Sequence, residues 1–242
     1  MERNNLRFIF IILLVFKFTF SFAQQNETIN TDRPDQSDGT YILPKKYLQI
    51  ENGVTTLNGF FVNNLMLRYG ITNSTELRLL CDYGKDNQLL GFMPLGLSFK
   101  QRIINENKII PAVTFVAYAR NENIASKDFK SKNFTYSFLL AFQNTITENF
   151  SIGYNVSTNS IKNNIGFTTS LSYSLNEKYT VFSEYFSQFN NLQLPQHNID
   201  FGLMYLLKNN LQFDIAFGKS LTASNDLIYL TTGICYKFKL HK

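Results

Sequence analysis

The sequence predicts an all-β fold, a transmembrane antiparallel up-and-down β-barrel of about 12 strands. Three observations lead to this prediction. Apolar and polar side chains alternate at every second position from residue 47 almost to the end of the chain. An apolar run with an export signature precedes this region, and the connections between the expected strands alternate between short and long. An even number of strands of about 9 to 11 residues, joined in this way, is typical of bacterial outer-membrane barrels.

The hairpin over residues 64–83 is the clearest case of the alternation. Its apolar residues recur at every second position, whereas Arg68, Glu76, Arg78 and Asp82 all fall on the other face. Charged side chains do not form the centre of a dry core unless they are paired. We therefore expect the apolar face to contact outer-membrane lipid and the charged face to line the lumen.

Residues 1–23 have the pattern of a secretory signal peptide. Arg3 and Arg7 precede the apolar run 8–16, and small residues lead to a cleavage position after Ala23. A membrane anchor would need about 20 apolar residues without interruption, and this run is shorter. The pattern predicts export to the outer membrane of a Gram-negative cell.

The charge of the mature chain gives no indication of a nucleic-acid partner. Cleavage would remove Arg3, Arg7, Lys17 and Glu2, which leaves 20 basic and 17 acidic residues. The basic residues are scattered among acidic ones, whereas a nucleic-acid interface needs a clustered basic stripe. Nucleic-acid binding is therefore not expected.

Residues 24–46 are polar and lack strand alternation, so they are predicted to form an N-terminal periplasmic extension before the barrel at 47–242. A solvated, disordered leader is one interpretation. The other is a plug that enters the lumen from the periplasmic side, with Asp32, Arg33, Pro34 and Asp35 as its candidate residues. The spacing of the aspartates does not follow a known calcium loop, so neither a metal nor a cofactor is expected.

The other strands are placed by the same alternation. The facing of the expected strands at 109–119 and 179–187 stays open, because their two faces differ little in polarity. Connections alternate between short turns, expected in the periplasm, and mostly longer external loops, as at 188–197. The expected strands begin at residue 47 and continue through 64–83 as a pair, 91–104, 109–119, 134–143, 150–157, 165–174, 179–187, 199–205, 211–218 and 228–238.

A soluble β-barrel or sandwich is the structural alternative, because it alternates in the same way with its apolar face inside. Its polar face would be rich in Lys, Glu and Thr, but here that face is mainly Gly, Ser, Thr and Asn with charges of both signs. The chain also has 24 Phe and 13 Tyr, many of the tyrosines near strand ends, as an interfacial aromatic girdle requires. These features favour the membrane barrel.

The chain ends in TTGICYKF (231–238), which resembles the signal recognised by the outer-membrane assembly machinery, here through Gly233, Tyr236 and Phe238. A second resemblance covers more of the chain and is carried by TDRPDQSD (31–38), LPKKYLQIENG (43–53), LRYGITNSTELRL (67–79), FSEYF (182–186) and FGLMYLLKNNLQFDIAFG (201–218). These segments resemble the outer-membrane transporter-like family labelled "putative MetA-pathway of phenol degradation". That resemblance implies a barrel that moves small hydrophobic or aromatic solutes across the outer membrane, and it implies neither phenol binding nor degradation.

The sequence therefore predicts an outer-membrane transporter or channel for small solutes with a narrow, charge-lined lumen. The charges have two interpretations, a structural salt-bridge network that lets the wall bury charge and a constriction that aligns a passing solute. Both interpretations use the same candidate lumen residues, which are Glu51, Arg68, Glu76, Arg78, Asp82, Lys100, Arg102, Glu184, Asp200 and Asp214.

Two other functions are alternatives. A structural or adhesive barrel without transport would carry long external loops, and the loops here are modest. An outer-membrane lipid-modifying enzyme would need a nucleophile with a base, usually histidine. The only histidines are His197, in an expected external loop, and His241, near the end, and no G-x-S-x-G motif occurs. We therefore expect a protein that is not an enzyme.

Overall fold

The computed structural model describes residues 28–34, 36–57, 60–86, 88–131, 133–159, 164–190, 193–222 and 228–240. The expected signal peptide, the plug candidate Asp35 and His241 lie outside the described residues.

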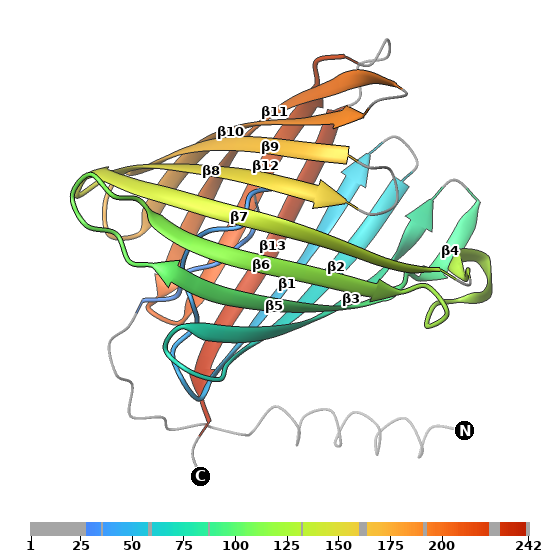
Figure 1. Cartoon of the computed structure of the whole chain (residues 1–242), viewed down its shortest axis with the longest axis horizontal. Helices are drawn as coiled ribbons and strands as arrows, with labels where there is room; N and C mark the ends of the chain where they lie inside the picture. Colours follow the sequence, from blue (N-terminus) through green and yellow to red (C-terminus); the bar gives the residue numbers. More distant parts are fainter. Residues whose placement is uncertain are drawn as a thin grey trace, which may run out of the picture.

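The chain forms a closed, 12-stranded antiparallel β-barrel, as predicted (Figure 1). Neighbouring strands in the chain pair with each other, and β1 closes the barrel by pairing with the last strand from Tyr47↔Lys239 to Leu57↔Tyr229. A thirteenth, short strand, β4 (Leu89–Phe92), pairs only with the end of β3. The barrel strands are β1 (Tyr47–Leu57), β2 (Phe60–Gly70), β3 (Thr75–Asp86), β5 (Leu95–Ile104), β6 (Ala112–Asn121), β7 (Phe134–Thr147), β8 (Phe150–Asn159), β9 (Asn164–Ser174), β10 (Tyr179–Asn190), β11 (Gln193–Lys208), β12 (Leu211–Ser220) and β13 (Ile228–Lys239).

The two ends of the barrel differ. One end, which we name the turn end, carries the start of β1, the end of β13 and the short turns such as 71–74 and 148–149. The opposite end, the loop end, carries the β3–β4 hairpin and the β6–β7 loop with the 3₁₀ helix η1 (Lys127–Phe129). Ser126 Oγ accepts a hydrogen bond from the Phe92 N–H at 2.8 Å, which ties the β6–β7 loop to β4.

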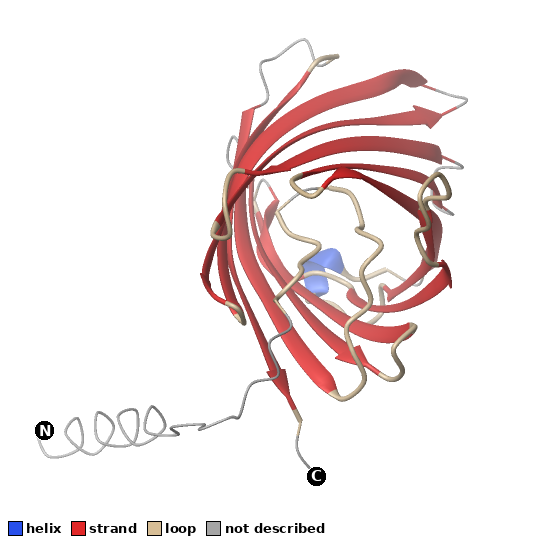
Figure 2. Ribbon diagram, turned by 90° about the vertical axis from the view of Figure 1, so that its left-hand side faces the viewer, coloured by secondary structure: helices blue, strands red, loops and turns tan. Residues whose placement is uncertain are grey.

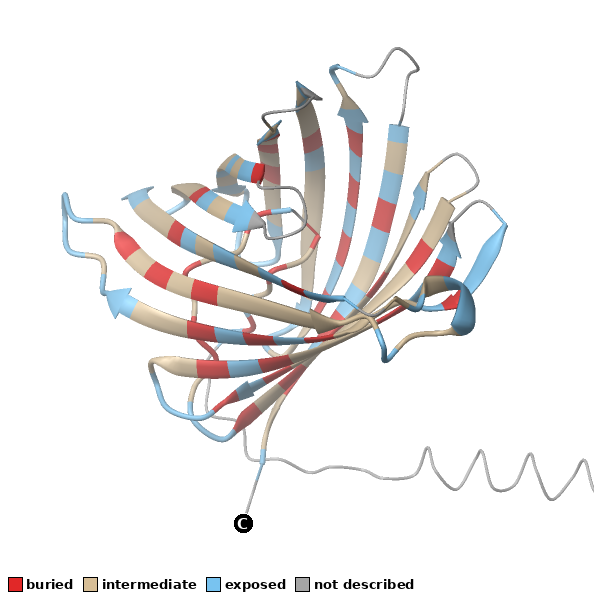
Figure 3. Cartoon of the chain, turned by 45° about the vertical axis from the view of Figure 1, so that its right-hand side comes forward, coloured by how far each residue is buried: buried red, intermediate tan, exposed pale blue. Residues whose placement is uncertain are grey.

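Inward and outward faces follow the predicted alternation, and buried bands recur along the strands in Figure 3. Leu97 and Phe217 are 62% and 57% exposed on the outside, whereas the inward side chains of Glu51 and Arg68 are fully buried. The structure also gives the facing of the two strands that the sequence left open. Thr114 and Val116 point inward in β6, and Phe182 and Glu184 point inward in β10.

Two predicted strands are interrupted or shortened at a proline. The expected strand 91–104 is two strands, β4 and β5, separated by Met93 and Pro94, and the expected strand 109–119 begins only at Ala112, after Pro111. Proline lacks the N–H that a ladder needs, which explains both interruptions.

The expected external loop 188–197 is mostly strand, because β10 and β11 extend to Asn190 and from Gln193. In this extension β11 pairs with β10 alone, since its pairing with β12 starts at Asn198, and such an edge tolerates Pro195. His197 therefore lies in a strand, with Nδ1 2.6 Å from Tyr185 Oη.

Among the described residues, no helix has the length and apolarity needed to cross a bilayer.

The outward face gives a test of the membrane register. Ile215 lies at the middle of β12 and is 46% exposed. We expect Ile215→Arg to lower the free energy of unfolding in lipid vesicles by about 2–4 kcal/mol, because it places a cation at the bilayer midplane. Leu221→Arg, just beyond the same strand, should cost about 0–1 kcal/mol. Denaturant titration followed by tyrosine fluorescence measures both, and equal losses would contradict this register.

Candidate functional site in the barrel lumen

Residues 28–34 and 36–46, here named the plug segment, run inside the barrel (Figures 1 and 2). Both ends of the segment are held at the turn end. The Ile29 N–H donates to Asn209 O at 2.6 Å, and the Lys46 N–H donates to Gly70 O at 2.9 Å. Leu43 is fully buried and Ile29 is 5% exposed, so the segment packs against the barrel as part of its interior.

Asp32 of the plug segment is surrounded by three cations of the wall. Lys100 Nζ lies 3.1 and 3.0 Å from the two carboxylate oxygens, Arg78 Nη2 donates to Oδ2, and Arg68 Nη1 is 3.4 Å from Oδ2. Burial by itself raises the pKa of the Asp32 carboxyl, but the charges of Arg68, Lys100 and Arg78 hold that pKa well below its usual range. Asp32 is therefore ionised at neutral pH.

Two carboxylates of the wall share the same cations. Arg68 donates to Glu51 from Nη1 and to Glu76 from Nε, both at 2.7 Å, and Arg78 Nε donates to Glu76 at 2.7 Å. The Leu43 N–H of the plug segment also donates to Glu76, at 2.8 Å. The alternation of β1, β2 and β3 places these groups on one inner face, where each charge is next to an opposite one.

Residues 36–38, the turn of the plug segment, are hydrogen-bonded to the wall that lies across the lumen from Arg68, Arg78 and Lys100. Glu184 of β10 accepts the N–H groups of Gln36 and Ser37 at 2.8 and 3.1 Å. Asn155 of β8 exchanges two hydrogen bonds with the backbone of Asp38, whose N–H donates at 2.9 Å and whose carbonyl accepts at 3.0 Å. The segment therefore spans the lumen from the charged wall to β8 and β10.

Asp38 connects this turn to the charged wall again. Its carboxylate accepts hydrogen bonds from Arg78 Nη1 at 2.7 Å and from Tyr118 Oη at 2.6 Å. Further along, the Thr40 carbonyl accepts from Arg102 Nε at 3.1 Å and from Thr114 Oγ1 at 2.9 Å. These contacts bring β6 into the group of strands that hold the plug segment.

Arg33 lies in a slot formed by two facing glycines, Gly53 of β1 and Gly233 of β13. A Cβ at either glycine would overlap the Arg33 side chain. Arg33 Nη2 donates to Asp214 at 3.3 Å and to Thr231 at 3.0 Å. Glycine at both positions thus makes room for a cation from the plug segment beside an inward carboxylate.

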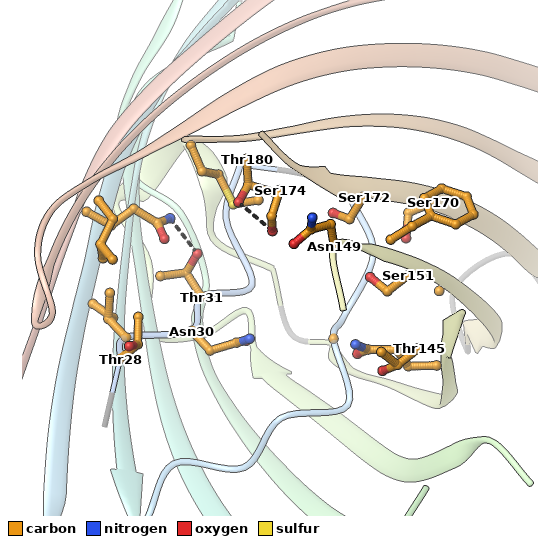
Figure 4. Close-up of a pocket in the computed structure, with 18 of the residues that line it drawn as sticks. Thr28, Asn30, Thr31, Thr145, Asn149, Ser151, Ser170, Ser172, Ser174 and Thr180 are labelled. Atoms are coloured by element: carbon orange, nitrogen blue, oxygen red, sulfur yellow. Dashed lines mark hydrogen bonds between the residues drawn. The ribbon is translucent and has the colours of Figure 1, made fainter. Parts of the chain in front are cut away.

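The plug segment separates two cavities in the lumen. The larger, about 710 Å³, opens toward the turn end and is lined by plug residues together with hydroxyl side chains such as Ser151, Ser172 and Thr180 (Figure 4). The smaller, about 250 Å³, lies toward the loop end against β6 to β10. Asp38 lines both cavities, so the turn of the plug segment stands between them.

The sequence-predicted lumen residues all point inward, but the structure divides them into separate groups. One group joins Glu51, Arg68, Glu76, Arg78 and Lys100 around Asp32. Arg102 contacts the plug backbone, and Asp214 contacts Arg33.

The remaining predicted residues lie apart from that group. Asp82 pairs with Arg120 at 2.9 Å, and Asp200 accepts from Tyr229 at 2.5 Å. Asp200 lies directly opposite Glu184 across the β10–β11 pair, and among the described residues neither carboxylate forms a salt bridge.

Sequence analysis missed Tyr118, Arg120, Gly53 and the inward role of Gly233. The glycine pair had a signal, since both glycines fall on the polar face of strands that must meet to close the barrel. Tyr118 and Arg120 belong to the strand whose facing was left open.

No metal or disulfide site is found among the described residues. No group of three or more His, Cys, Asp and Glu side chains within them is arranged to hold a metal ion, and Cys81 and Cys235 are both free thiols.

Comparison with known proteins identifies the family. Residues 31–238 match the family model described as "Putative MetA-pathway of phenol degradation". The chain belongs to this family. The match begins at the plug segment and ends in β13, so the family pattern includes the inserted segment as well as the barrel. A search of curated proteins found no match.

Solved structures of outer-membrane channels share the fold. The KdgM porin superposes with a TM-score of 0.64 at 12% identity, covering 78% of this chain and 99% of that one. The NanC porin gives 0.60 at 12% identity, with 79% and 100% covered. The COG4313 outer membrane channel from Pseudomonas putida F1 gives 0.58 at 12% identity, with 85% and 100% covered. At this identity the likeness shows a shared porin-like barrel fold.

The glycine slot gives a test of the docking of the plug segment. We expect Gly53→Ala to lower the free energy of unfolding by about 1–3 kcal/mol, because the new methyl group overlaps the Arg33 guanidinium. In an Arg33→Ala background, where the slot is empty, the same change should cost less than about 0.5 kcal/mol. Denaturant unfolding in vesicles of the unmodified protein, the two single variants and the double variant measures this double-mutant cycle. An equal loss of stability in both backgrounds would show that Arg33 does not occupy the slot.

Proposed function

We propose that this protein is an outer-membrane channel for small solutes that is closed at rest by its plug segment. The proposal includes export through residues 1–23, assembly through the C-terminal strand with Gly233, Tyr236 and Phe238, and contact of the outward face with outer-membrane lipid. The porin-like fold and the exposed apolar belt support this location.

The observation that carries the proposal is the position of the plug segment between the two cavities. Asp38 borders both cavities, and Gln36 and Ser37 bind Glu184 on the far wall. A solute that crosses the lumen along the barrel axis has to displace this turn. The charges around Asp32 act in the resting state as a structural network, and they become accessible to a solute when the segment moves.

The solute is expected to be small, and the family description favours an aromatic or hydrophobic compound with a polar group. The cavity at the turn end is lined by hydroxyls from Ser151, Ser170 and Thr180, which can donate to and accept from such a group. A volume of about 710 Å³ is within the range of sites for small molecules.

A structural barrel without transport is the second candidate. The density of buried ion pairs between the plug segment and the wall favours it, because such a network can serve stability alone. Conductance separates the two functions.

Planar-bilayer recordings of the mature chain test the channel. We expect rare conductance steps for residues 24–242 and frequent steps when residues 24–46 are deleted, provided that both proteins migrate as folded barrels. Steps in neither protein would support the structural barrel and contradict the channel.

A point variant tests the plug with less disruption. The two carboxylate oxygens of Glu184 accept one N–H each, from Gln36 and from Ser37, whereas the amide of Glu184→Gln has only one acceptor oxygen. The variant therefore leaves one of the two N–H groups unpaired, which costs about 1–3 kcal/mol. We expect its open fraction to rise about tenfold or more over the unmodified protein. Asp128→Asn, which removes an exposed carboxylate from the β6–β7 loop, is the matched control and should leave the open fraction unchanged. An unchanged open fraction in Glu184→Gln would contradict this role for Glu184.

A further inference from the structure

We propose that Arg68, Arg78 and Lys100 form a binding site for the carboxylate of a small solute, and that Asp32 occupies this site in the resting protein as an internal substitute. The inference rests on the proposed function, because the solute reaches the site only when the plug segment moves. It specifies small carboxylates as the class of solute that binds in the lumen.

The geometry around Asp32 is that of a carboxylate receptor. Cations from three neighbouring strands, β2, β3 and β5, converge on one carboxylate, and all three side chains are fully buried. Lys100 contacts both carboxylate oxygens. Arginine and lysine donors placed in this way form strong charge-assisted hydrogen bonds with any carboxylate of the right size.

The charge of the wall requires an anion at this position. Glu51 and Glu76 offset two of the three cations, which leaves one positive charge on the wall. Asp32 of the plug segment offsets this charge, and Asp38 adds a further carboxylate beside Arg78. When the segment moves away, the wall keeps one uncompensated buried cation. A buried, unpaired charge is costly, so the vacated site favours entry of another anion.

The rest of the lumen helps to select the position and the ligand. Glu184 and Asp200 face each other on the opposite wall, and among the described residues neither has a cation partner that could attract a carboxylate there. The 250 Å³ cavity borders Asp38 and Tyr118, beside Arg78, and gives room for the body of the solute. The site therefore fits a small organic monocarboxylate better than a neutral solute.

Equilibrium binding of radiolabelled benzoate to the refolded mature chain tests the site. Benzamide, a neutral molecule of nearly the same shape, is the probe control. We expect Asp32→Asn to bind benzoate at least about tenfold more tightly than the unmodified chain, because its internal competitor has lost its charge. Benzamide should bind weakly to both. Lys100→Met added to Asp32→Asn should remove the benzoate binding, and Asp128→Asn should behave as the unmodified chain.

Three results would overturn the assignment. If the benzoate affinity does not rise in Asp32→Asn, Asp32 does not compete with benzoate for the site. If the benzamide affinity rises equally, the cavity binds without recognising charge. If inorganic phosphate binds as tightly as benzoate, the site accepts anions in general. If Asp32→Asn does not refold, the unmodified chain decides: benzoate should raise the frequency of conductance steps and benzamide should not, and equal effects overturn the proposal.

The same preparations separate this inference from the proposed function. If Asp32→Asn binds benzoate but the barrel shows no conductance steps even after deletion of residues 24–46, the carboxylate site is supported and the channel function is contradicted. If the deletion gives conductance steps but the protein does not prefer benzoate over benzamide, the channel function is supported and the carboxylate site is contradicted.

Discussion

The carboxylate of Asp32, placed among Arg68, Arg78 and Lys100, is the interaction on which the rest of the structure depends. A barrel wall that buries three cations and two carboxylates of its own is unbalanced without a further anion, and the plug segment supplies it. The same segment fills the space between the walls. Its removal therefore changes both the shape and the charge of the lumen, which links the closed state of the proposed channel to the ion pairs that hold it.

The barrel itself could be predicted from the sequence because a membrane barrel imposes one rule on every strand. Lipid requires an apolar side chain at every second position, so the outward orientation of Leu97 and Phe217 can be predicted without knowledge of the residues that they contact. The inward charges Arg68, Glu76 and Arg78 followed from the same rule. The rule failed where both faces carry similar residues, as in β6 and β10. There the facing depends on pairing with neighbouring strands.

The plug segment could be proposed from the sequence but not placed, since it has no periodicity and its partners lie far away in the chain. Asp32 contacts Lys100 and Arg33 contacts Asp214, and nothing local to either residue indicates these contacts. They follow from the closed register that places Gly53 against Gly233 and opens a slot between them. Asymmetry of the walls has the same origin, because Glu184 and Asp200 on β10 and β11 lie across the lumen from Arg68, Arg78 and Lys100 only once the barrel closes.

The central claim is that the plug segment is bound across the lumen in the resting protein, and amide hydrogen exchange of the refolded mature chain tests it most directly. The Gln36 and Ser37 N–H groups donate to Glu184, and the Leu43 N–H donates to Glu76. The account predicts that these three amides exchange as slowly as those of the neighbouring barrel strands. Exchange at the rate of an unstructured chain, with the barrel strands still protected, would contradict it.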